Sequence, residues 1–196
     1  MRSAMVRSLT DRWWGPAAHR RYAAVVDAFL AIASKREVRR YADRPLSGEL
    51  QRRILDAGRV SGNSANRQQL RFVAIADRDL LAQLAETVYV SDNIRGARLA
   101  VAIVVHGKGP TSFDAGRAAQ NMMLAAWNEG VGSCPNGMPD RAATADVLGL
   151  REGEEPAIVL TFGYPERPRR KPESQSAEAW VEAADRKAFE EVVERL

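Results

Sequence analysis

Apolar residues along the chain occur partly at helical spacing and partly in short unbroken runs, which predicts a mixture of helices and strands. Tyr22–Ile32 carries apolar residues at helical spacing, and Ser47 is a typical N-cap for the helix that follows it. The same criteria, with Asp140 as a second cap, predict helices over Gly48–Gly58, Arg78–Thr87, Asp114–Asn128, Asp140–Leu148 and roughly Ser176–Leu196.

Three runs have the length and composition of strands: Arg71–Asp77, Leu99–His106 and Pro156–Tyr164. The continuous apolar character of the second run is typical of a central strand that is buried on both faces. Polar and glycine-containing residues predict a loop at Ser61–Asn66 and a turn-rich loop at Gly132–Pro139. Because strands and helices alternate, the chain is expected to form an α/β or α+β fold around a sheet of four to five strands.

The 196 residues fit one main domain with short additions at its ends. We expect an N-terminal extension over residues 1–25, anchored by Trp13 and Trp14, a domain over residues 26–172, and a C-terminal helix over residues 173–196. The basic start of the chain is interrupted by charged residues, so no signal peptide is expected. No apolar run reaches the roughly 18 residues of a membrane span.

The formal net charge is +4, and arginine and lysine gather in two clusters, Lys35–Arg40 and Arg167–Lys171. Each cluster alone is typical of a solvated surface. A nucleic-acid-binding protein would carry longer basic stretches with aromatic residues between them, so two short clusters suit a small anionic ligand at least as well. The single cysteine, Cys134, excludes an intrachain disulfide and fits a reducing cytoplasm.

Several common catalytic motifs are missing from the sequence. It contains no phosphate-binding P-loop, no dinucleotide-binding glycine fingerprint after a strand, and no serine nucleophile elbow. His19 and His106 are the only histidines, too few for a histidine-based metal cluster, and a structural role is favoured for His106. Cys134 fits a small buried thiol better than a nucleophile paired with His106. If the chain is an enzyme, a bound cofactor would have to supply its reactivity.

Seven short segments, in order, resemble the motifs of the nitroreductase family over residues 30–172. Lys35–Tyr41 with Asp43 and Pro45 resembles the family pattern R-R-S-x-R-x-F with a downstream D-x-P, and Asn66–Phe72 resembles N-x-Q-P-W-x-F. The remaining similarities are to the helix pattern D-x-x-x-A-x-Q-N-x-x-L-A-A and to the motifs G-x-G-S-C, L-G-L and G-Y-P, at Asp114–Ala126, Gly130–Cys134, Leu148–Leu150 and Phe162–Pro165.

This resemblance implies an α+β fold with a mostly antiparallel sheet, in a domain-interlocked homodimer that holds FMN between its subunits. It also implies an oxidoreductase in which NAD(P)H passes hydride to flavin N5, and an electron-poor acceptor such as a nitroaromatic or a quinone then takes it up. Two alternatives remain open: another flavin-dependent redox reaction, or a protein that stores FMN or binds nucleic acid without catalysis. Neither a membrane nor a metal ion is implied.

By resemblance, the phosphate and ribityl chain of FMN would lie near Lys35 and Arg36, together with Arg169, Arg170 or Lys171. Arginine forks and lysine are well suited to a phosphate dianion. Arg39 would lie near flavin N1 and O2, where a cation favours the reduced ring. Asn66, and less strongly Gln68, would bond the pyrimidine edge or the ribityl hydroxyls. Taken alone, an asparagine such as Asn66 more often caps a loop.

The segment Pro135, Asn136 and Gly137 corresponds to the family loop that covers one ring face, where the backbone N–H of Gly137 would point at N5. Taken alone, this segment could equally be a plain turn. Two departures from the family pattern stand out. Glu37 replaces a serine at the expected flavin site, and Gln69–Leu70 replaces Pro-Trp. Glu37 either points away from the phosphate or leaves it to Arg36 and the C-terminal basic residues.

Overall fold

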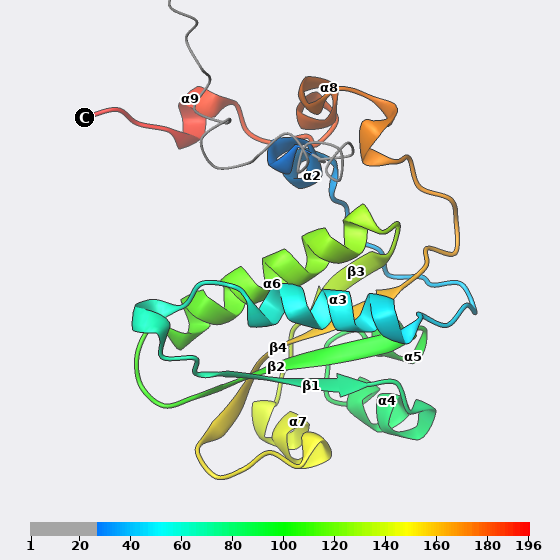
Figure 1. Ribbon diagram of the computed structural model, residues 1–196, viewed down its shortest axis with the longest axis vertical. Coiled ribbons are helices and arrows are strands. Elements are labelled where there is room, and N and C mark those ends of the chain that lie inside the picture. Colours follow the sequence, from blue (N-terminus) through cyan, green and yellow to red (C-terminus); the bar gives the residue numbers. More distant parts are fainter. Residues whose placement is uncertain (1–26) are drawn as a thin grey trace, which may run out of the picture.

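The protein, described here from a computed structural model over residues 27–196, is built on a four-stranded antiparallel sheet (Figure 1). The strands are β1 Leu70–Ile75, β2 Leu99–His106, β3 Gly132–Asn136 and β4 Glu154–Gly163. Their order across the sheet is β1-β2-β4-β3. This arrangement confirms the α+β alternative with a four-stranded, antiparallel sheet.

The register of the strands shows which ends of the sheet lie together. Leu70 of β1 pairs with Val105 of β2, whereas Leu99, at the start of β2, pairs with Phe162 near the end of β4. Gly132, the first residue of β3, pairs with Gly163. The beginning of β1 and the beginning of β3 therefore lie at opposite ends and opposite edges of the sheet.

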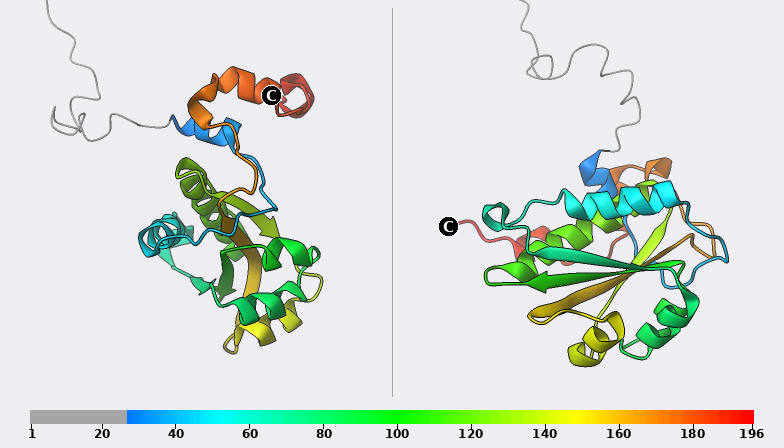
Figure 2. Two further views of the ribbon diagram at one scale, coloured as in Figure 1. Left: turned by 90° about the vertical axis from the view of Figure 1, so that its right-hand side faces the viewer. Right: turned by 60° about the horizontal axis from the view of Figure 1, so that its bottom comes forward.

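Helices cover both faces of the sheet (Figures 1 and 2). On one face, α3 Gly48–Arg59 and α6 Thr111–Asn128 pack through Ile54 and Met122 against Ile103 and Phe162. The opposite face buries Ala102 and Val104. It is covered by α4 Arg78–Ala85, α5 Ser91–Arg95 and α7 Arg141–Leu148. Alternation along β2 supplies both cores, as the predicted double burial of this strand requires.

The two ends of the described chain come together beyond α6. The helix α2 Ala28–Ser34 packs against α8 Ala177–Glu182, and α9 Phe189–Val192 follows (Figure 1). A short 3-10 turn, η3 Pro172–Ser174, precedes α8. The packing of α2 against α8 brings the segments near residues 35 and 170 together, although they are far apart in the sequence.

Most predicted elements are confirmed, including the caps Ser47 and Asp140, which accept backbone N–H groups of α3 and α7. The prediction of a turn-rich loop over Gly132–Pro139 was wrong for residues 132–136, because these residues pair with β4 and form the strand β3. The prediction of one continuous helix over Ser176–Leu196 was also wrong. It divides into α8 and α9, and Asp185 between them has a left-handed φ of 49°, which an α-helix cannot contain.

Some predictions concern residues or boundaries that the structure does not describe. The N-terminal extension with Trp13 and Trp14, His19 and the beginning of the helix predicted over Tyr22–Ile32 lie outside the described residues. The division of the chain at residues 25 and 172 stays a prediction. Within residues 27–196, no helix is long and apolar enough to cross a bilayer.

Candidate functional site

The basic segment, which we define as Lys35–Tyr41, lies along the free edge of β3. Glu37 forms a parallel bridge with Ser133, and the Val38 amide donates to the Ser133 carbonyl at 3.0 Å. Glycine at position 132 allows the basic segment to lie this close to β3, because a Cβ added there would lie 2.5 Å from the Val38 Cβ. The backbone of the basic segment is thus held beside the start of β3, within the stretch Gly130–Cys134 that resembles the family motif G-x-G-S-C.

Tyr41 anchors the far end of the basic segment. Its buried hydroxyl donates to the Val38 carbonyl at 2.6 Å and lies 2.9 Å from the Thr161 hydroxyl on β4. Burial raises the pKa of Tyr41 well above its ordinary value, so the hydroxyl keeps its proton. Backbone bonding continues beyond it, where the Ala42 amide donates to the Tyr164 carbonyl at 2.8 Å.

Lys35 and Glu37 form an ion pair inside the chain. The Lys35 ammonium lies 2.5 Å from Glu37 Oε1 and 3.6 Å from the Met123 sulfur, and only 6% of the lysine side chain is exposed. Glu37 Oε2 and the neighbouring Ser133 hydroxyl are buried without a hydrogen-bond partner. Such groups are rarely left unsatisfied, and a ligand hydroxyl could complete them.

Arg36 faces the C-terminal helix. Its guanidinium donates to the carbonyls of Ala33, Lys35 and Trp180 at 2.6, 3.0 and 3.1 Å, and its centre lies 5.2 Å from the Trp180 ring. These groups border a cavity of about 280 Å³. Its lining is Arg36, Trp127, Pro168, Arg169, Arg170 and Trp180. Three of the arginines predicted to meet a phosphate therefore share one cavity.

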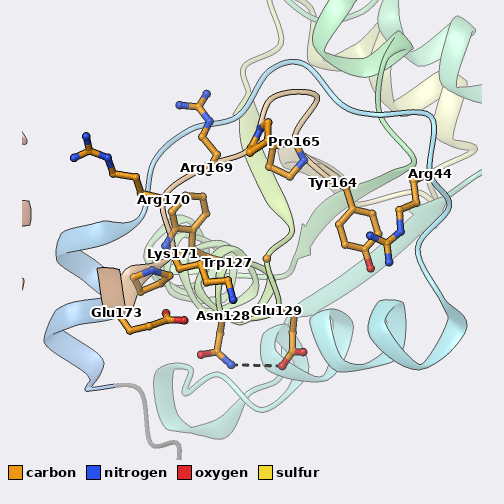
Figure 3. Close-up of a pocket in the computed structure, with 13 residues that line it drawn as sticks. Arg44, Trp127, Asn128, Glu129, Tyr164, Pro165, Arg169, Arg170, Lys171 and Glu173 are labelled. Carbon is orange, nitrogen blue, oxygen red and sulfur yellow. Dashed lines mark hydrogen bonds between the residues drawn. The ribbon is translucent and has the colours of Figure 1, made fainter. Parts of the chain in front are cut away.

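Arg39 borders a second cavity of about 280 Å³, between the basic segment and the residues that follow β4. Arg169 and Glu37 also line it. A third cavity, of about 550 Å³, includes Lys171 in its wall (Figure 3). There Arg44 stacks on Tyr164 at 3.8 Å, on the side away from Lys171. Arg169 borders all three cavities, which makes it the common basic residue of this region.

Asn136 belongs to a buried hydrogen-bond network at the end of β3. Asn93 donates to its side-chain oxygen at 2.9 Å, and its amide nitrogen donates to the carbonyls of Cys134 and Val159 at 3.0 and 3.2 Å. The adjacent residues Pro135 and Gly137 are exposed. The side chain of Asn136 is therefore used within the protein, whereas the exposed backbone beside it is accessible to a ligand.

Gly137 follows β3 and lies against the ring of Tyr89. Its carbonyl accepts the Tyr89 amide at 3.1 Å, and an added Cβ would come within 3.2 Å of the ring. Tyr89 itself is 73% exposed. Glycine favours this close packing, because a side chain here would press on the Tyr89 ring. The approach of the Gly137 N–H to flavin N5 stays a prediction.

Cys134 and His106 do not form a nucleophilic pair. Cys134 is buried beside Thr161, whereas His106 is exposed and pairs with Glu154 at the other end of β4. Burial raises the pKa of the Cys134 thiol, and the Glu37 carboxylate adds to that effect. The buried, protonated thiol confirms the structural interpretation of Cys134. No cluster of three metal-ligating side chains occurs among the residues described.

Asn66 and Gln68 lie far from the basic segment. They belong to the exposed loop around η2 Ser64–Asn66 and have left-handed φ values of 53° and 54°. The loop is tied to α6, because Asp114 accepts the Ser64 amide at 3.0 Å. From strand spacings, the start of β1 lies roughly 20 Å along the strands and about 19 Å across the sheet from Glu37. One chain does not bring Asn66 together with Arg36 and Arg39.

Trp180 and Ser133 are site residues that the sequence alone did not suggest. The one signal for Trp180 was a lone tryptophan within a stretch of alanine, valine and glutamate, Ala177–Ala184. Ser133 stood within the G-x-G-S-C resemblance, but its pairing with Glu37 depends on the unforeseen strand β3. Contacts of this kind cannot be read from local spacing.

Comparison with known proteins relates this architecture to one family. The model of the nitroreductase family matches residues 32–104 and 110–164. A protein of Archaeoglobus fulgidus called "Putative NADH dehydrogenase/NAD(P)H nitroreductase" is 28% identical over 144 residues, which cover 68% of this chain and 83% of that protein.

Solved structures agree with this match. A "putative nitroreductase in complex with FMN" from Desulfovibrio desulfuricans has a TM-score of 0.73 and 26% identity, covering 87% of this chain and 98% of that one. A nitroreductase family protein from Clostridium difficile has the same TM-score and 22% identity, covering 86% and 98%. The second likeness shows a shared fold.

Proposed function

The chain belongs to the nitroreductase family, and from that premise we propose that it is an FMN-dependent oxidoreductase. In this proposal it passes hydride from NAD(P)H to an electron-poor acceptor, such as a nitroaromatic or a quinone. The observation that carries the proposal is the meeting of Arg36, Arg169 and Arg170 around one cavity. These residues come from two segments more than a hundred positions apart, which only the fold unites.

The phosphate end of the site would consist of arginines. Arg36 retains two of its five N–H groups after donating to three carbonyls, and Arg169 and Arg170 face the same cavity. A phosphate dianion suits such forks. Lys35 is paired with Glu37, so its charge is largely balanced within the chain. The proposed phosphate site therefore depends on Arg36 and on the C-terminal basic residues.

The region between Arg36 and Arg39 suits the ribityl chain and the ring. Ribityl hydroxyls could donate to Glu37 Oε2, and the Ser133 hydroxyl could complete its own bonding in the same place. Bound FMN would supply the hydride-accepting ring. Arg39 would place a cation near the pyrimidine edge, and the Gly137 amide would be available at the ring face. These assignments use groups that the structure leaves exposed or unsatisfied.

Asn66 would reach the flavin only from a second copy of the chain. Its separation from the basic segment within one chain supports a homodimer in which each flavin lies between subunits. Exposure of Phe29, Ile32 and Phe113, each more than half exposed, is consistent with surfaces that a partner subunit covers. Under this proposal, Gln68 belongs to the same partner loop.

Absorbance spectroscopy of the purified protein tests the proposed function. We expect a yellow protein with flavin bands, bleached by NADH or NADPH without air and recoloured by a quinone or nitroaromatic acceptor. Flavin bands that NAD(P)H does not bleach would indicate storage instead of catalysis. A colourless preparation that takes up no added FMN would overturn the proposal. DNA affinity that falls steeply with salt would favour the nucleic-acid alternative.

A further inference from the structure

Trp180 connects the two segments that supply the arginines of the proposed phosphate site. It lies in α8 and is 7% exposed. Its carbonyl accepts an N–H of Arg36, its ring lies beneath the Arg36 guanidinium, and its indole N–H donates to the Pro172 carbonyl at 2.9 Å. One side chain thus contacts the basic segment and also the stretch that begins two residues after Arg170.

We propose that Trp180 is a positioning residue, which orients Arg36 and the basic stretch Arg169–Lys171 for the phosphate of FMN. The inference rests on the proposed function and deepens it, because it assigns α8 a role in choosing phosphorylated over unphosphorylated flavin. Trp180 acts through Arg36 and through the backbone at Pro172. The selected ligand class is a flavin bearing a terminal phosphate.

Arg36 is the residue whose freedom this arrangement restricts most, because an arginine side chain is long and mobile when nothing holds it. Its two terminal nitrogens donate to carbonyls, and the indole ring supports the guanidinium plane. Fixing it before the ligand binds removes an entropy cost that binding would otherwise meet. The remaining N–H groups then stand ready for a phosphate.

The basic stretch is fixed from the other side of the cavity. Trp180 holds Pro172 through the indole N–H, and Trp127 donates to the Ser34 hydroxyl at 3.1 Å, which attaches α2 to α6. Both tryptophans line the cavity that contains Arg36, Arg169 and Arg170. The walls of the phosphate site are thus held by indole groups, whereas the arginines supply the charge.

The experiment compares the affinities of FMN and riboflavin for the flavin-free full-length protein, because riboflavin lacks the phosphate. Trp180→Leu removes both the ring and the indole donor. The Trp180 backbone carbonyl still accepts the Arg36 N–H in this variant. We therefore expect FMN binding to weaken about three- to tenfold, because the Arg36 side chain and the basic stretch must then be ordered on binding, while riboflavin binding changes less than about twofold. Trp180→Phe keeps a ring beneath Arg36 and should retain most of the preference for FMN. Val181→Ala, on the exposed side of the same helix, is the matched control.

A double-mutant cycle distinguishes positioning from general damage. If Trp180 acts through Arg36, the effects of Trp180→Leu and Arg36→Ala on the ratio of FMN to riboflavin affinity will be less than additive. Trp180→Met replaces the leucine variant if that one does not fold. Equal weakening of both flavins, or an unchanged ratio, would overturn the inference while leaving the proposed function intact. Wild-type protein that binds neither flavin would overturn both.

Discussion

The basic segment and the loop of residues 63–68 resemble parts of one family site, yet they differ sharply in how the chain holds them. The basic segment is bonded to β3, anchored by the buried Tyr41 hydroxyl and fixed at Arg36 by α8. The loop of residues 63–68 is tied down mainly by Asp114 and Asn63, and Asn66 and Gln68 project from the surface with left-handed φ.

This difference shows what one chain can complete by itself. The phosphate end of the proposed site is assembled by contacts within a single chain. Under the proposed function, a contribution from Asn66 would have to come from another molecule, because the two regions lie at opposite corners of the sheet. The hydrogen bonds of the loop are local or go to Asp114, whereas those of the basic segment reach β3, β4 and α8 and so preorganise a site for an anion.

The largest effect on FMN affinity is expected from replacing Arg169, which borders all three cavities described above. Arg169→Ala should weaken FMN binding by roughly ten- to a hundredfold, the value of a charged hydrogen bond to phosphate, and leave riboflavin binding nearly unchanged. Fluorescence titration of flavin-free protein measures both. Arg186→Ala, another exposed arginine, is the control for net charge. Equal losses in the two arginine variants would mean that Arg169 has no specific role.

Gly132→Ala tests whether the basic segment depends on close contact with β3. The new methyl group would meet Val38, so the free energy of unfolding should fall by about 1–3 kcal/mol, and FMN should bind more weakly. Chemical denaturation gives the stability. Gly48→Ala meets no atom within 4 Å and should change stability by less than about 0.5 kcal/mol. A Gly132→Ala protein as stable as wild type would contradict the observed packing.

Asn66→Ala should have a smaller effect that does not depend on phosphate. Loss of one neutral hydrogen bond would weaken FMN and riboflavin alike, by about three- to tenfold. Mixed dimers sharpen this test. A chain carrying Arg169→Ala paired with one carrying Asn66→Ala should regain a wild-type site in each dimer if Asn66 comes from the partner. Failure to regain that site would place both residues in one chain or neither in the site.

The smallest expected effect is a change of stability with pH, caused by Glu154 at the end of the sheet near the loop of residues 63–68. Glu154 accepts two hydrogen bonds from Arg71, and the Arg151 amide donates to it at 2.9 Å. The hydrogen bonds from Arg71 and Arg151 lower the Glu154 pKa to about 2. Because the folded pKa is below the unfolded one, this stabilisation is present above about pH 4.5 and is lost towards pH 2. Wild type should therefore lose more stability than Glu154→Gln between pH 6 and pH 3 in urea unfolding.

Local patterns predicted much of this molecule and missed what depends on distant contacts. Buried strands such as Leu99–His106 and capped helices such as the one after Ser47 follow from periodicity and cap chemistry. Residues 132–136 contain glycine, proline and asparagine, which favour turns, yet pairing with β4 makes them a strand. Likewise, the basic clusters were visible in the sequence, whereas the Lys35–Glu37 pair and the Trp180 contact with Arg36 exist only in the fold.

The most direct test of the central claim is a parallel titration of the flavin-free wild-type protein with FMN and with riboflavin. If Arg36 and the basic stretch Arg169–Lys171 form a phosphate site, FMN will bind once per chain and at least about tenfold more tightly than riboflavin. Equal affinities for the two flavins, or no uptake of either, would contradict the account.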